Sequence, residues 1–282
     1  MFIRIGPKTT EIPVAVLVPN FITTLSMCSG LASIHFSLMG KWEHAVAAIA
    51  MAMIFDALDG RAARMLRVSS KFGAVLDSLS DFVSFGVAPA IILHQWLLKP
   101  AISPLELGAV MVFALCAGLR LARFTAAVPG VKPAPPPPSP TAPPTAAGTS
   151  LPPASAVSGA TSNYFTGMPT PAGAATVMIP AMHELAGWTT WKFPQWSIAA
   201  LAFATGLLMV STLPTFAFKK LSIRRPLVIP AMILLGFVAV SLVTHLWLTL
   251  MIIASLNLAL VPWSWFVRRR ARMAAPKAAT AP

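Results

Sequence analysis

The chain has 282 residues, of which 56% are hydrophobic and only 10% are charged, so it has too few polar side chains to cover a water-soluble globule. Its net charge of +13 would suit nucleic acid, but the Lys and Arg residues cluster at the ends of apolar stretches and form no single basic surface. The composition therefore argues against a soluble domain and a nucleic-acid-binding protein, and it favours a membrane protein.

The predicted fold is all-α: a polytopic membrane helix bundle with about eight transmembrane helices. Apolar runs close to the ~20 residues that cross a bilayer recur along the chain, separated by short polar or Pro/Gly-containing joints. They cover about 14–39, 44–66, 73–98, 105–127, 167–190, 195–217, 226–244 and 246–266. When alternate ends of these segments are assigned to one side, 18 of the 21 Lys and Arg residues fall there. This bias predicts that both termini lie in the cytoplasm.

The expected organisation follows from these segments and from the composition between them. A stretch rich in Pro, Ala, Ser and Thr has too little apolar bulk to fold, so we expect a disordered cytoplasmic loop there. The predicted regions are an interfacial segment (1–13), helices one to four (14–127), the disordered loop (128–162), helices five and six (163–217), helices seven and eight (218–267) and a basic tail (268–282).

Two polar residues, Asn20 and Thr23, lie near the cytoplasmic end of the first apolar segment. Polar side chains inside a bilayer commonly face the interior of the bundle. They either contribute to a polar pocket there or join neighbouring helices by hydrogen bonds.

Four of the eight acidic residues fall within 56–81, at the end of the second segment and the start of the third. Asp56 and Asp59 are one helical turn apart, as are Asp77 and Asp81, so a helical hairpin would bring the two pairs together. Clustered carboxylates suit a hard divalent cation such as Mg²⁺, Mn²⁺ or Ca²⁺, and the absence of nearby Cys or His argues against zinc.

A second interpretation of the four carboxylates is that basic side chains of the link between the two helices neutralise them. The spacing argues against it, because loop charges do not account for i, i+3 and i, i+4 pairs in two successive segments. The basic residues concerned are Arg61, Arg64, Arg67 and Lys71.

Small residues flank the link, and they would allow a phosphate or a base to approach the backbone closely. Gly60 and Gly73 are the two glycines at its ends. Arg64 is well placed for a phosphate oxygen, because a guanidinium donates two parallel hydrogen bonds.

This region resembles the signature of the CDP-alcohol phosphotransferases at every fixed position, in the pattern Asp56-x2-Asp59-Gly60-x2-Ala63-Arg64-x8-Gly73-x3-Asp77-x3-Asp81. Within that family, the stretches 55–90, RLARF at 120–124 and FTGMPTPA at 165–172 resemble the bacterial phosphatidylserine synthases. The resemblance implies transfer of the phosphatidyl group from CDP-diacylglycerol to the hydroxyl of L-serine, with release of CMP. It also implies a homodimer with one site per protomer. With the Lys and Arg bias, the prediction is a protein of the bacterial inner membrane whose active site faces the cytoplasm.

The resemblance also implies roles for the motif residues. Asp56, Asp59 and Asp77 would hold divalent metal, which would be two ions of Mg²⁺ or Mn²⁺. Gly60, Arg64 and Gly73 would contact the CDP portion. Asp81 would bridge the metals and deprotonate the attacking hydroxyl. A metal-polarised phosphoryl group stabilises the charge that develops in the reaction.

Arg120 and Arg123 lie one turn apart at the cytoplasmic end of the fourth segment. They would recognise either the carboxylate of serine or a lipid phosphate, although topology alone also accounts for basic residues there.

Three other functions fit parts of the sequence. Another family member would use glycerol phosphate, inositol phosphate or choline as the acceptor. A cation transporter would also contain intramembrane carboxylates, but it would place them near the midplane. A lipid-binding scaffold would use the Pro-rich loop to bind partners.

Overall fold

The computed structural model describes residues 14–66, 70–98, 103–126, 164–188, 192–211, 214–216 and 228–274. Helices form almost all of the described chain, as the apolar segments predict, together with one pair of short strands. The predicted N-terminal segment, the whole Pro-rich loop and the end of the basic tail lie outside the described residues.

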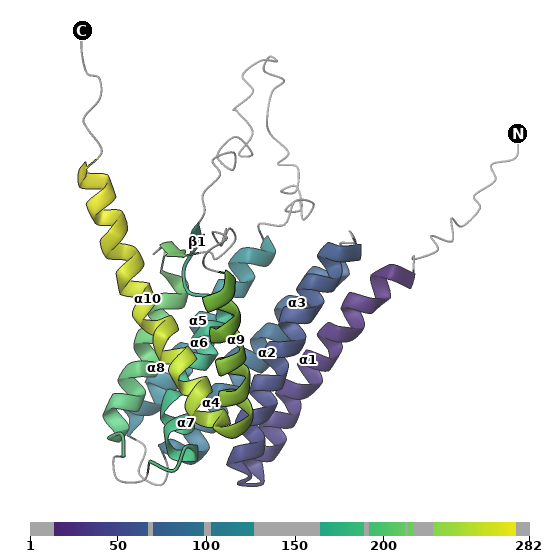
Figure 1. The fold of residues 1–282 in the computed structure, drawn as a ribbon. Helices are drawn as coiled ribbons and strands as arrows, with labels where there is room; N and C mark the ends of the chain where they lie inside the picture. The colour runs from purple at the N-terminus through teal and green to yellow at the C-terminus, as the bar shows by residue number, and fades with distance from the viewer. Residues whose placement is uncertain are drawn as a thin grey trace, which may run out of the picture.

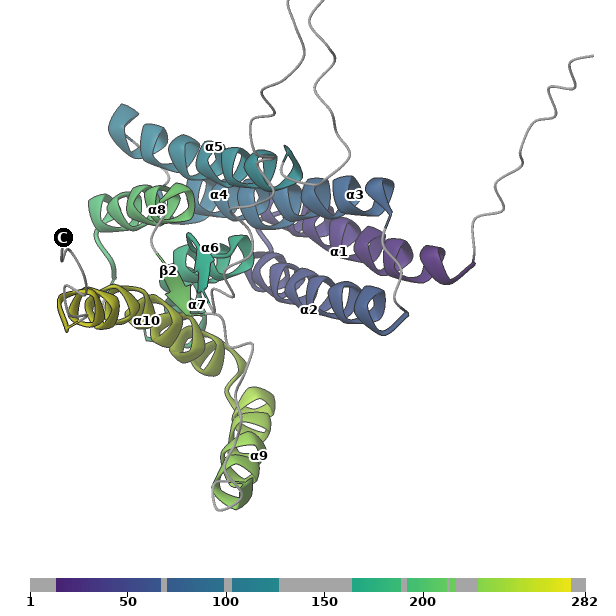
Figure 2. The ribbon, with the colours of Figure 1, turned by 90° about the horizontal axis from the view of Figure 1, so that it is seen from above.

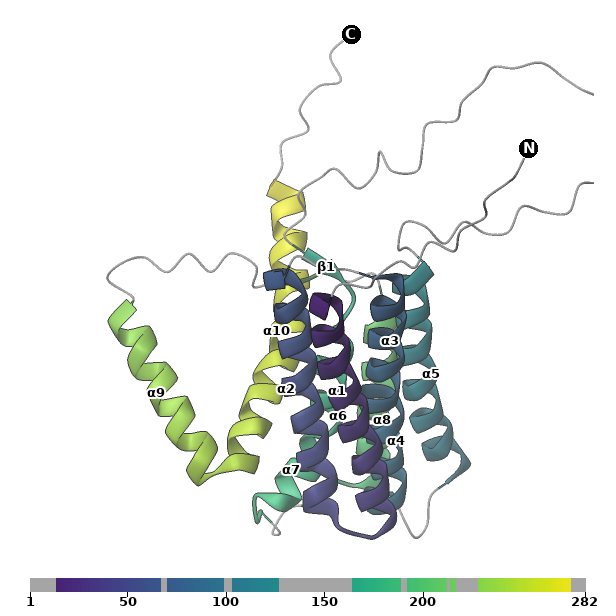
Figure 3. The ribbon, with the colours of Figure 1, turned by 90° about the vertical axis from the view of Figure 1, so that its right-hand side faces the viewer.

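The first two helices, α1 (Val14–Leu38) and α2 (Trp42–Leu66), form an antiparallel hairpin and lie side by side along their length (Figures 1 and 3). Hydroxyl groups on α1 tie the pair together. Ser26 donates to the carbonyl of Ala52 at 3.0 Å, and Ser33 donates to that of Ala45 at 2.8 Å. The small side chains let the two helices approach closely. Close packing and hydrogen bonds then hold the helices together, because lipid provides no hydrophobic driving force between them.

The third helical stretch is continuous but changes its winding. It comprises α3 (Lys71–Asp81), the π-helix η1 (Phe82–Val87), α4 (Ala88–Ile92) and the π-helix η2 (Leu93–Leu97). The wide turn of η1 packs against α1, where Ser84 donates to the carbonyl of Ser26 at 3.2 Å. Gly30 permits this approach, because a Cβ on it would overlap Ser84.

The remaining helices of the main bundle are α5 (Pro104–Ala126), α6 (Thr170–Val177), α7 (Ile179–Leu185) and α8 (Gln195–Val210). α5 begins with a reciprocal cap, in which Glu106 accepts from the Ser103 amide at 2.8 Å and Ser103 accepts from the Glu106 amide at 3.3 Å. The expected fifth helix is divided at Met178, two residues before Pro180. Pro lacks an amide hydrogen, which favours a break at this position.

Two short strands, β1 (Tyr164–Thr166) and β2 (Pro214–Phe216), pair in antiparallel orientation, with Tyr164 opposite Phe216 and Thr166 opposite Pro214. The purely helical expectation did not include them. They bring the segment before α6 beside the segment after α8, and Met168 N then donates to Leu208 O at 3.3 Å. We call residues 164–169 the strap.

The last two helices, α9 (Val228–Thr244) and α10 (Leu246–Ala274), follow the main bundle. α10 packs along α6 and α7, whereas α9 projects away from the other helices (Figures 2 and 3). Large apolar side chains of α9 such as Ile229, Phe237 and Val243 are exposed, which is the surface expected against lipid.

By length and hydropathy, three helices in the described part of the chain suffice to cross a bilayer: Leu17–Leu38, Phe72–Leu97 and Pro104–Ala126. α2 is long enough but carries several charged side chains, which lower its hydropathy. The described helices follow the order of the predicted segments, and the number of eight spans stays a prediction.

Candidate active site

Three carboxylates meet between the C-terminal half of α2 and the middle of α3. One oxygen each of Asp56, Asp59 and Asp77 lies within 4.8 Å of the others. The antiparallel arrangement of the helices causes this, because the end of one and the start of the next lie at the same depth (Figure 1). Three negative charges at such a distance repel one another unless a cation lies between them. The donor set therefore fits a hard divalent cation.

Asp81 lies one turn farther along α3 and outside this group of three. Its side chain lies near that of Asp56, and its Oδ1 is buried and has no hydrogen-bond partner in the described chain. A buried acceptor without a partner costs about 1–3 kcal/mol, so its presence indicates a missing ligand.

Thr23 of α1 supports the carboxylate group from the neighbouring helix. Its hydroxyl lies 2.7 Å from Asp59 Oδ2 and 3.0 Å from the carbonyl oxygen of Pro19. One proton serves only one of them fully, and the charged acceptor forms the stronger bond. Thr23 and Asp59 are both buried, at 4% and 5% exposure. The hydroxyl therefore orients this carboxylate and stabilises its charge.

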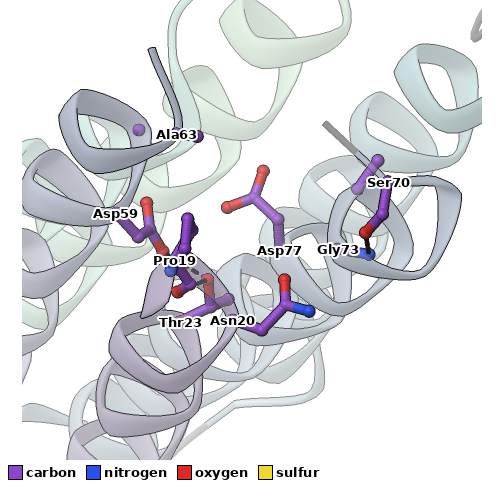
Figure 4. A pocket seen from close by; sticks show the side chains of 10 residues that line it. Pro19, Asn20, Thr23, Asp59, Ala63, Ser70, Gly73 and Asp77 are labelled. Atoms are coloured by element: carbon purple, nitrogen blue, oxygen red, sulfur yellow. Dashed lines mark hydrogen bonds between the residues drawn. The ribbon is translucent and has the colours of Figure 1, made fainter. Parts of the chain in front are cut away.

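A pocket of about 200 Å³ opens beside the carboxylates. Figure 4 shows the side chains of Asp59, Asp77, Thr23 and Asn20 around the same space. The walls come from α1, α2 and the start of α3. The lining residues are Pro19, Asn20, Thr23, Asp59, Gly60, Ala63, Ser70, Gly73, Ala74 and Asp77. Acidic groups, one amide and a small-residue wall make the pocket suitable for a metal-bound polar ligand.

Two glycines line this pocket, and they have different surroundings. A Cβ on Gly73 would lie 2.7 Å from Asn20 Oδ1, whereas one on Gly60 would meet only the guanidinium of Arg64, at 3.8 Å. Gly73 therefore lets α3 pack closely against α1, and Gly60 leaves space in the pocket beside the Arg64 guanidinium.

Ser70 is a pocket residue that the sequence reasoning missed. Its hydroxyl caps α3 by accepting from the Gly73 amide at 2.9 Å (Figure 4). The sequence contained a signal for this cap, because a Ser directly before the first residue of a helix is a favoured N-cap.

The two arginines of α5 have different surroundings. Arg120 Nη1 donates to the Thr170 hydroxyl, and its guanidinium lies 4.7 Å from the centre of the Phe124 ring. Arg123 is exposed and donates to the carbonyl of Val210 at 3.3 Å. Neither arginine lines the pocket, but Arg120 is within electrostatic range of Asp81.

Two of the four basic residues of the link, Arg61 and Arg64, lie in the described part of the chain. Arg61 and Arg64 are exposed, while the Asp59 side chain is buried. Arg67 and the side chain of Lys71 lie outside the described residues.

Comparison with known proteins gives consistent relatives. Residues 16–207 match the family model described as CDP-alcohol phosphatidyltransferase. A Mycobacterium leprae protein named CDP-diacylglycerol–serine O-phosphatidyltransferase is 32% identical over 88% of this chain and 74% of its own length. Proteins of the same name from Mycobacterium bovis and Helicobacter pylori are 33% and 29% identical, over 73% and 79% of this chain. These matches cover 63% of the M. bovis protein and 82% of the H. pylori protein.

Proposed function

Because the chain belongs to the CDP-alcohol phosphatidyltransferase family, we propose that it transfers the phosphatidyl group of CDP-diacylglycerol to the hydroxyl of L-serine and releases CMP. The serine acceptor is supported by the names of the relatives from three bacteria. The observation that carries the chemistry is the group formed by Asp56, Asp59 and Asp77 beside a polar pocket.

Asp56, Asp59 and Asp77 would hold the divalent metal, Mg²⁺ or Mn²⁺, and Asp81 would contribute a ligand to a second ion. When bound, such ions neutralise the diphosphate and the charge that develops on it during transfer.

The pocket of α1, α2 and α3 would receive the CDP portion. Gly60 and Gly73 let the nucleotide approach the backbone, and exposed Arg64 is available to a phosphate oxygen. Asn20 contributes an amide to the same wall, and Thr23 keeps the Asp59 carboxylate oriented. We assign exposed Arg123 to a lipid phosphate.

Asp81 would act as the general base of the transfer. The serine oxygen forms a bond to the phosphorus that carries the diacylglycerol, the bond between this phosphorus and the CMP oxygen breaks, and the hydroxyl proton passes to Asp81. The reaction needs no covalent enzyme intermediate, so the chain's contribution is positioning, electrostatics and this proton transfer.

The protein is an integral membrane protein, and we propose eight spans with both termini and the active site on the cytoplasmic side of the bacterial inner membrane. The excess of Lys and Arg on that side supports this orientation. We also propose a homodimer with one site in each protomer, an assembly that the molecular mass in detergent would test.

The decisive experiment measures CMP release by the purified chain with CDP-diacylglycerol and Mg²⁺ or Mn²⁺. We expect release that depends on both serine and metal. Glycerol phosphate, inositol phosphate and choline serve as parallel acceptors, and release with one of these but not with serine would contradict the serine assignment. Metal flux into proteoliposomes without any CMP formation would instead favour a transporter.

A further inference from the structure

A second polar group lies one turn farther along α3 from the nucleotide pocket, where Asp81 of α3 comes within electrostatic range of Arg120 of α5 and Arg120 contacts Thr170 of α6. Its basic member is Arg120, whose Nη1 donates to Thr170 and whose guanidinium is placed over the Phe124 ring. The Thr170 side chain is fully buried. Two different contacts therefore hold the guanidinium in place near Asp81.

Two buried atoms in this group have no hydrogen-bond partner in the described chain: Arg120 Nε and Asp81 Oδ1. One is a donor on a cation and the other an acceptor on a carboxylate, yet they do not bond to each other. Buried charged groups are rarely left this way unless a ligand completes them. The ligand that satisfies both has an anionic group for the arginine and an O–H or N–H for the aspartate.

The strap holds Thr170 in position independently of Arg120. Gly167 has a φ of +81°, and a Cβ on it would lie 2.8 Å from the carbonyl oxygens of Met209 and Ser211. The next residue, Met168, donates to Leu208 O, and Pro169 occupies the N-cap position of α6, which begins at Thr170. The end of α8 thus fixes the start of α6, which presents the hydroxyl to Arg120.

We propose that Arg120 and Asp81 border an acceptor subsite. In this subsite Arg120 binds the carboxylate of the acceptor, and the acceptor hydroxyl donates a hydrogen bond to Asp81. Thr170 is a positioning residue that orients the guanidinium. This inference rests on the proposed function. It gives the two arginines of α5 different roles, because Arg123 is exposed and donates to a backbone carbonyl at the surface. It predicts that the enzyme prefers a hydroxy acid to a neutral alcohol as the acceptor.

The test compares serine with serinol, which has the same hydroxyl and amine but no carboxylate, in the purified full-length protein. In Arg120→Gln we expect the KM for serine to rise roughly 10- to 100-fold, the effect of losing hydrogen bonds to a charged group. The KM for CDP-diacylglycerol should change less than about twofold, and any turnover of serinol should stay the same. Arg61→Gln is the matched control, because it removes one charge from an exposed position near the same end of the bundle.

A second pair of variants keeps the test independent of the folding of Arg120→Gln. Thr170→Val should raise the KM for serine with little change for CDP-diacylglycerol, and Thr170→Ser should restore it. An unchanged serine KM in Thr170→Val, or an equal rise for both substrates in Arg120→Gln, would overturn the inference. Failure of the proposed function would appear differently, as absence of serine-dependent CMP release in the unmodified protein.

Discussion

Asn20 on α1 approaches Gly73 on α3 so closely that a Cβ on Gly73 would lie 2.7 Å from Asn20 Oδ1. The same Cβ would lie 3.0 Å from Ser70 Oγ, the cap of α3. These three residues share one wall of the pocket. The width of the pocket therefore depends on the absence of a side chain at position 73.

Gly73→Ala should weaken the use of CDP-diacylglycerol more than it destabilises the fold. The flexible Asn20 amide can move away from the new methyl group, but this changes the pocket wall, and overpacking of this kind costs about 1–3 kcal/mol. We expect the KM for CDP-diacylglycerol to rise by roughly tenfold, measured by CMP release at varied lipid substrate. Gly108→Ala on α5 is the control, because a Cβ there meets nothing within 4 Å. A normal KM in Gly73→Ala would show that Asn20 does not border the substrate.

Thr23→Val should raise the metal concentration needed for activity. The substitution keeps the shape of the side chain but removes the 2.7 Å hydrogen bond to Asp59. Loss of a group that orients a metal ligand typically lowers metal affinity by about 10- to 100-fold. The measurement is the Mg²⁺ or Mn²⁺ concentration at half-maximal CMP release, and Thr23→Ser should remain close to the unmodified protein.

Thr24→Val provides the matched control for this prediction. Thr24 is the next residue on α1, but it is exposed and bonds only to the backbone carbonyl of Asn20 at 2.8 Å. Its substitution should leave the metal requirement unchanged. Equal shifts in the two variants would mean that the effect comes from α1 as a whole and not from the Asp59 carboxylate.

The proximity of the carboxylates could be inferred from the sequence, because helical spacing and a short link determine which faces of α2 and α3 meet. The depth of Asn20 and Thr23 in the first helix likewise indicated that they could reach this region. The geometry within the group needed tertiary information. Spacing suggested four equivalent carboxylates, whereas one oxygen each of three lies within 4.8 Å of the others and Asp81 stands outside this group.

Other features carry no local signal in the sequence. Arg120 and Thr170 are separated by 50 positions, so only packing of α5 against the start of α6 reveals their hydrogen bond. The β1–β2 pair joins residues on either side of α6, α7 and α8. The π-helical winding after Asp81 accompanies the packing of η1 against α1. The apolar pattern of one segment gives no signal for this packing.

Asp81→Asn should abolish turnover more completely than it weakens CDP-diacylglycerol binding. Asn keeps the size of the side chain but cannot accept the proton of the acceptor hydroxyl, and loss of a general base typically costs about 10²- to 10⁴-fold in rate. Substrate binding and single-turnover CMP release distinguish the two effects. Asp77→Asn, which alters one of the three clustered carboxylates, should reduce binding and turnover together. The same pattern in Asp81→Asn would indicate a metal ligand only.

Gly167→Ala should both destabilise the protein and impair the use of serine. A left-handed backbone costs a non-glycine residue about 1–3 kcal/mol, and at this position the new Cβ would also press on the backbone carbonyls of Met209 and Ser211. The strap would then shift Thr170, so the KM for serine should rise along with a lower Tm in detergent. Gly187→Ala separates the two causes, because Gly187 has a similar φ of +83° but nothing within 4 Å of a Cβ. Gly187→Ala should show only a smaller loss of Tm. A comparable rise in the serine KM of Gly187→Ala would show that the strap does not act on the acceptor subsite.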